Sequence, residues 1–142
     1  MKRLRLILIL ICLLSIMSCE NVFHNDKLDF LWRLDSVEYL DGKDFYGNPC
    51  KKEPKSGFWF SFSRDLIEIE NGNSQFKAIG ILKDSGDVLV FDFSMYQDWP
   101  VIMDGLRMMG MDSLVSVFNV TELDRRKLIL TGSKTVLELT RW

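Results

Sequence analysis

The most reactive side chains in this sequence are three cysteines, Cys12, Cys19 and Cys50, and one histidine, His24. A catalytic cysteine needs a neighbouring base that holds its thiol as a thiolate. Cys50 lies in the turn-rich stretch GNPCKKEPK, whereas His24 lies in a short polar segment well before it. The sequence therefore offers no nucleophile–base pair, and it favours Cys50 as a partly buried loop thiol.

Acid–base chemistry would depend on Asp92, Tyr96 and Asp98. Asp92 lies in an apolar, strand-like run and points either into a barrel or outward. Asp98 precedes an expected helix start, where carboxylates cap backbone amides. The histidine and cysteine content cannot supply a zinc site, and the aspartates lack the spacing of a calcium loop. We therefore predict a non-enzymatic protein that holds no metal and no cofactor.

Residues 1–18 have the three-part pattern of a secretory signal peptide. Lys2, Arg3 and Arg5 form a positive start, residues 6–14 are an unbroken apolar run, and small serines follow. The apolar run is about half as long as a membrane-spanning helix requires. The pattern therefore indicates export of the chain rather than a stop in the membrane.

The residues around Cys19 resemble a bacterial lipobox, with Ile16, Ser18 and Cys19 at the matching positions. The resemblance implies cleavage between Ser18 and Cys19 and attachment of acyl chains such as palmitate to Cys19. Two or more acyl chains hold a protein stably on a bilayer. Because Glu20 stands where aspartate marks inner-membrane retention, we expect the outer membrane of a Gram-negative envelope, on either its periplasmic or its surface face. The alternative is an uncleaved signal anchor.

The charge of the mature chain argues against two classes of partner. Cleavage removes three of the 18 Lys+Arg and leaves 15 against 20 Asp+Glu, a net charge of −5. Nucleic-acid binding requires a basic face, and docking on anionic lipid requires a basic cluster. We expect neither.

The length suits one domain, so we assign 19–27 to a lipidated tether and 28–142 to the domain. Cys50 has no partner for an intramolecular disulfide.

Hydrophobic alternation predicts an all-β domain with one short helix. The expected strands are 32–40, 57–63, 66–70, 75–82, 87–94, 114–123, 127–131 and 135–142. Short turns join most of them, which implies an antiparallel meander, and eight strands avoid open edges by closing into a barrel. Pro100 to Met109 has helical spacing between strands five and six, with Gly110 ending the helix. Residues 45–57 are expected as a long irregular loop.

This chain resembles the small lipocalin-like lipoproteins of Gram-negative bacteria. The resemblance rests on Trp32 in LWRL, the GFWFSFS strand, the KAIGIL–GDVLVFDF hairpin and the KLILTG–TVLELTRW ending. It implies a cation–π pair between Trp32 and Arg141 that closes the base of the barrel. Two features depart from the family pattern: Phe30 replaces the usual glycine, and the helix precedes the sixth strand instead of following the last.

A barrel of eight strands is either filled by side chains or holds one small ligand. Our leading hypothesis is a small apolar ligand in the barrel, with candidate contacts at Trp59, Phe60, Phe91, Trp99 and Met103. The alternative is a filled barrel that binds an envelope protein through residues 43–57 and 95–113. The first hypothesis predicts an apolar cavity beside Trp59 or Trp99. The second predicts an exposed apolar patch on those two segments.

Overall fold

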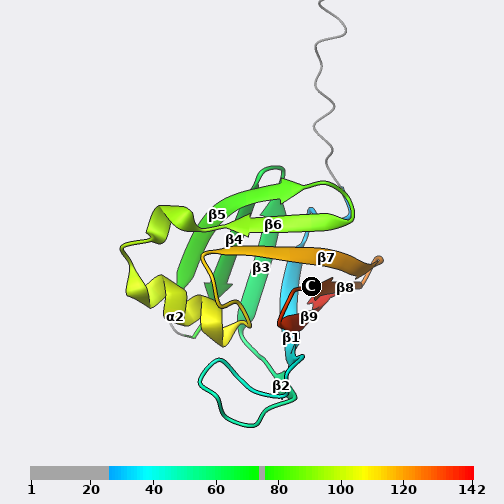
Figure 1. The fold of residues 1–142 in the computed structure, drawn as a ribbon. Coiled ribbons are helices and arrows are strands. Elements are labelled where there is room, and N and C mark those ends of the chain that lie inside the picture. Colours follow the sequence, from blue (N-terminus) through cyan, green and yellow to red (C-terminus); the bar gives the residue numbers. More distant parts are fainter. Residues whose placement is uncertain (1–25, 74–75) are drawn as a thin grey trace, which may run out of the picture.

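The structure is a computed structural model that describes residues 26–73 and 76–142. The predicted signal peptide, the cleavage site at Ser18 and the lipidated Cys19 lie outside the described residues. The elements, shown in Figure 1, are β1 (Leu31–Tyr39), β2 (Lys52–Pro54), β3 (Phe58–Ser63), β4 (Leu66–Asn71), β5 (Lys77–Asp84), β6 (Val88–Asp92), the 3-10 turn η1 (Ser94–Tyr96), α2 (Pro100–Met108), β7 (Val115–Leu123), β8 (Lys127–Thr131) and β9 (Thr135–Arg141).

The strands form a closed antiparallel barrel, because β1 pairs with β3 on one edge and with β9 on the other. β2 pairs with Ser36–Glu38 of β1, and β3 pairs with Leu31–Arg33 of the same strand. β9 already occupies the other edge of β1, so β2 and β3 are two parts of one bent strand. The predicted eight-stranded meander barrel is confirmed. The expected loop at 45–57 differs in one respect, since β1 extends past β3 and its free edge holds β2 as a strand.

The two ends of the barrel carry different elements (Figure 1). We call one end the base; it consists of residues 26–31, the turns at 64–65, 85–87 and 124–126, and Trp142. The opposite helix end consists of the 40–51 loop, residues 93–114 with η1 and α2, and the turn at 132–134. Among the described residues, no helix is long and apolar enough to cross a membrane.

Inward-facing side chains fill the barrel, as the alternating burial of the strands shows. Phe91 lies at the centre of this core and is completely buried. Its ring centroid lies 6.4 Å from Phe60, 5.9 Å from Phe62 and 5.1 Å from Phe118. Protein interiors of this kind are packed as densely as organic crystals, so four aromatic rings at these distances leave little room on the barrel axis.

Helix α2 covers the helix end and confirms the prediction for Pro100 to Met109 to within one residue. Pro100 lies at the start, where its missing amide costs nothing. Leu106 and Met109 are buried in the barrel core. Gly110 ends the helix with a φ of +84°, and a Cβ there would lie 2.6 Å from Cγ1 of Val37. Only glycine suits both the left-handed backbone and this close contact.

A candidate binding pocket beside strand β7

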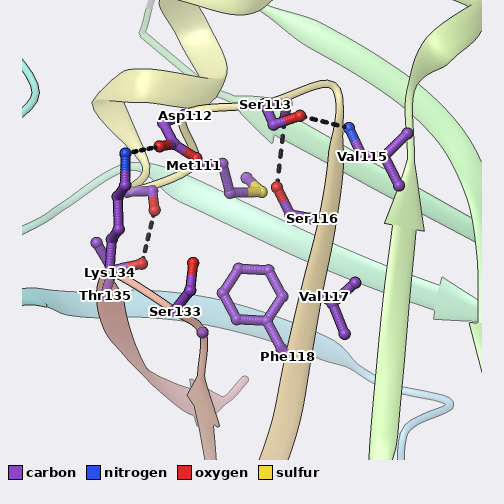
Figure 2. A pocket seen from close by; sticks show the side chains of 12 residues that line it. Met111, Asp112, Ser113, Val115, Ser116, Val117, Phe118, Ser133, Lys134 and Thr135 are labelled. Atoms are coloured by element: carbon purple, nitrogen blue, oxygen red, sulfur yellow. Dashed lines mark hydrogen bonds and ion pairs between the residues drawn. The ribbon is translucent and has the colours of Figure 1, made fainter.

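The pocket arises from a difference in length between two neighbouring strands. β7 has nine residues and β8 has five, and their pairing begins at Asn119 and Thr131. Residues 115–118 of β7 therefore extend past the end of β8. The space beside this edge is enclosed by the 110–113 loop and the 132–135 turn, and it forms a pocket of about 280 Å³ (Figure 2).

The pocket has an apolar floor and polar walls. Phe118 and Met111, both buried, form the floor. Figure 2 shows the hydroxyls of Ser116 and Ser133 beside the Phe118 ring, while Val117 points away toward the outer surface. The Ser116 hydroxyl donates a hydrogen bond to the carbonyl of Ser113 over 3.2 Å. Such a mixture of an aromatic surface and hydroxyl groups suits a small molecule with one apolar face and one polar edge.

The β7 backbone adds a donor and an acceptor to the polar wall. The amide of Val120 donates to the carbonyl of Asp87, so even-numbered residues of β7 direct their backbone groups toward β6. Backbone groups alternate between the two edges of a strand, and Val117 therefore directs its N–H and C=O toward the side of β8. The β7–β8 ladder begins only at Asn119, so these groups of Val117 face the pocket.

Two side-chain contacts fix the rim of the pocket. The buried Thr135 hydroxyl donates to the carbonyl of Gly110 over 2.7 Å and ties the 110–113 loop to β9. Lys134 Nζ lies 2.5 Å from the carboxylate of Asp112. The hydrogen bond to Asp112 raises the pKa of Lys134 above its usual value. Because Lys134 is already paired, the pocket carries no unbalanced charge at its rim, which favours a neutral ligand.

The residues that the sequence suggested for ligand binding lie in three separate places. Phe60 and Phe91 are in the filled interior. Trp59 lies on the outer wall, with its ring 5.0 Å from Trp142. Trp99 is 62 % exposed beside Tyr96, and Met103 is half-buried against the core. None of these side chains lines the pocket beside β7. Sequence reasoning missed that pocket because its glycine and serine residues are also ordinary turn residues.

Of the three polar residues considered for acid–base chemistry, Asp92 and Tyr96 are held by separate local contacts. Helix α2 begins without a side-chain cap, so the capping role expected for Asp98 is not observed. Asp92 accepts a hydrogen bond from the amide of Ser94 over 3.0 Å, and the hydrogen bonds from Ser94 lower the pKa of Asp92. The Tyr96 hydroxyl accepts from the amide of Ile79. Cys50 is a free thiol, half-buried against the core. In residues 26–73 and 76–142, no group of histidine, cysteine and acidic side chains is arranged to hold a metal ion.

The base of the barrel is closed by a stack of an arginine on a phenylalanine. Trp32 and Arg141 lie directly opposite each other in the β1–β9 register, but Arg141 makes its cation–π contact with Phe30 and not with Trp32 as predicted. The guanidinium carbon of Arg141 lies 3.0 Å from the centroid of the Phe30 ring. Trp32 is completely buried, and its indole N–H donates to the carbonyl of Leu28 over 3.1 Å. Phe30, which stands in place of the family glycine, thus provides the ring on which Arg141 stacks.

Comparison with known proteins identifies the fold. A family model described as a lipocalin-like domain matches residues 12–142. Two solved structures, both 16 % identical, are similar. One is an uncharacterized protein from Bacteroides eggerthii DSM 20697, with a TM-score of 0.65 over 81 % of this chain and 99 % of the other. The other is a lipocalin-like protein from Bacteroides uniformis ATCC 8492, with a TM-score of 0.61 over 82 % and 99 %. No curated protein matches the chain.

Proposed function

The chain belongs to the lipocalin-like domain family, and we propose that it is a lipid-anchored, non-enzymatic binding protein of the cell envelope. A lipocalin-like barrel is suited to binding one small ligand. The resemblance of Ile16 to Cys19 to a lipobox supports attachment through Cys19. The glutamate after Cys19 supports the outer membrane as the site of attachment.

The observation that carries the ligand-binding proposal is the contrast between the barrel axis and the pocket beside β7. Phe60, Phe91 and Phe118 occupy the axis, whereas the space above Phe118 and Met111 is open. Its volume of about 280 Å³ is close to the lower end of the ~300–1,000 Å³ range of ligand sites. We expect a small neutral molecule with its apolar face on Phe118 and its polar edge on the serine hydroxyls and the Val117 backbone.

Native mass spectrometry of the lipidated protein, purified in detergent from its own host, tests this assignment. Ser133→Trp places a large ring at the mouth of the pocket. Ser85→Trp is the matched control, because Ser85 is also an exposed serine in a hairpin turn but lies at the base. We expect a bound small molecule on the wild type and on Ser85→Trp and none on Ser133→Trp. A ligand retained by Ser133→Trp, or none on any form, would contradict the assignment.

One observation favours partner binding as a second function. Met95, Trp99 and Val101 are 70 %, 62 % and 74 % exposed, and they lie in one short segment at the helix end. Large apolar side chains gathered in this way are typical of protein contact sites. Affinity capture with the lipidated wild type and with a Trp99→Ser variant tests it. A partner lost only from the variant supports this function, and equal capture by both contradicts it.

A further inference from the structure

The base of the barrel carries an exposed tryptophan on a fixed backbone. Trp142 is 73 % exposed, and its amide donates to the carbonyl of Leu31 over 2.9 Å. Its ring stands edge-on against Trp59, and the guanidinium of Arg33 lies 6.0 Å from the ring centroid. Leu31 beside it is also exposed. An apolar ring with a polar N–H, held at the rim of a domain, suits the boundary between water and lipid.

The arginines gather at the same end of the barrel. Apart from Arg107 on α2, every arginine in the described part of the chain lies at the base or in the adjoining half of a strand: Arg33, Arg64, Arg125, Arg126 and Arg141. The base also has a recess of about 490 Å³, lined by Phe30, Leu123, Arg125 and Arg141 among others. Guanidinium groups bind phosphate through paired N–H donors, and this recess places two of them beside apolar side chains.

The covalent chain favours the base as the end of the barrel that lies nearer the lipid. Asp26, the first described residue, belongs to the base and lines its recess. It follows Cys19 by seven positions, with six residues between them, and seven steps along the chain reach at most about 25 Å whatever their conformation. The helix end is farther from Asp26 than the base is, by the height of the barrel, which is about 20 Å for tilted strands of nine residues.

We propose that the base of the barrel docks on the bilayer that holds the acylated Cys19. Trp142 enters the interfacial layer, and the arginines of the base contact lipid phosphates. This proposal depends on the lipid anchor in the function proposed above. It also fixes the direction of the binding site, because the pocket beside β7 and Trp99 belong to the helix end and then face the aqueous side.

Docking of this kind differs from attraction by a basic patch. The arginines of the base alternate with acids: Arg33 is paired with Asp35 at 2.9 Å, and Asp124 accepts the amides of Arg126 and Lys127. The mature chain is acidic overall. Long-range attraction to anionic lipid is therefore weak, and the contact depends on short-range burial of the indole and on direct phosphate contacts. We expect it to persist when salt is raised.

Quenching of tryptophan fluorescence by brominated lipid tests the orientation. The full lipidated protein is reconstituted into phosphatidylcholine–phosphatidylglycerol vesicles, with and without bromine on the acyl chains. Trp142→Phe is compared with Trp99→Phe, because both indoles are exposed but they lie at opposite ends. We expect bromine to quench the wild type and Trp99→Phe, and most of this quenching to disappear in Trp142→Phe at both low and high salt.

The outcomes separate docking from anchoring. The intact mass of the same sample reports whether Cys19 is acylated, and a missing acyl mass would refute the anchor itself. An acylated protein without bromine quenching would overturn the docking proposal alone, as would quenching that disappears in Trp99→Phe. A dimer in detergent that dissociates on Trp142→Phe would assign this surface to a second copy and would also overturn docking on lipid.

Discussion

Truncation of Phe91 tests whether the barrel axis is filled. Phe91 is completely buried and its ring faces three others, with centroids 5.1 to 6.4 Å away. In Phe91→Ala the other rings remain in place and a cavity replaces the lost ring. The size of this cavity is set by the lost phenyl group, because the strands around the core keep it from collapsing into the space.

The expected loss in the free energy of unfolding is about 3–5 kcal/mol, the range for truncation of a fully packed phenylalanine. This includes the ring–ring contacts, which contribute ~0.5–1.5 kcal/mol per pair beyond buried area. Such a loss is a large part of the ~5–15 kcal/mol that stabilises an ordinary domain. If a ligand cavity lay beside Phe91, the ring would have fewer neighbours and its loss would cost far less.

Urea unfolding of the soluble chain from Glu20, followed by tryptophan fluorescence, measures the effect. Met95→Ala is the control, because that side chain is mostly exposed and should change stability by no more than about 0.5 kcal/mol. The slope of the unfolding free energy against urea should stay the same in both variants. A loss below about 1 kcal/mol for Phe91→Ala, with an unchanged slope, would refute the filled axis.

Three further predictions concern the helix end. Burial and the carboxylate of Glu53 raise the pKa of Tyr39, so the neutral Tyr39 hydroxyl stabilises the fold below pH ~10, and this stabilisation is lost as the pH rises above that value. Tyr39→Phe should flatten this alkaline decline of the unfolding free energy, measured by urea titration at several pH values. An unchanged decline in the variant would contradict the prediction. Thr135→Val removes the bond to Gly110 and should cost ~1–3 kcal/mol, whereas an unchanged urea midpoint would show that the bond is unimportant. Gly110→Ala forces a side chain against Val37 at a left-handed φ and should cost at least ~1–3 kcal/mol, measured by thermal unfolding; a melting temperature equal to that of the wild type would contradict the strain.

The sequence was informative about the barrel because each strand has its own pattern. Phe58, Phe60 and Phe62 alternate with less buried residues, and the structure buries all three. The helix was predictable for the same reason, since Pro100 and Gly110 mark its two ends. Local patterns of this kind are set by residues close together in the chain, so they can be read without knowing which distant segments pack against them.

The candidate pocket was not predictable from any local pattern. It depends on the register between β7 and β8, which leaves residues 115–118 without a neighbour on one edge. Residues 52–54 show the same limit, because they become β2 only through the free edge of β1. The position of Arg141 over Phe30 joins residues 111 positions apart in the chain. Such features depend on how distant segments meet, and a single sequence does not state this.

The seam between β1 and β9 has a consequence for how the chain folds. Trp32 pairs with Arg141, so the barrel closes only when its first and last strands meet. Closing a loop of about 110 residues costs roughly 4 kcal/mol in chain entropy, and this cost is met before the seam contributes any stability. Contacts between distant residues slow folding. The other strands join successive neighbours, so we expect an open curved sheet to form early and the seam to close last. A chain that ends before Thr135 lacks both β9 and the partner edge of β1, and it would remain such an open sheet.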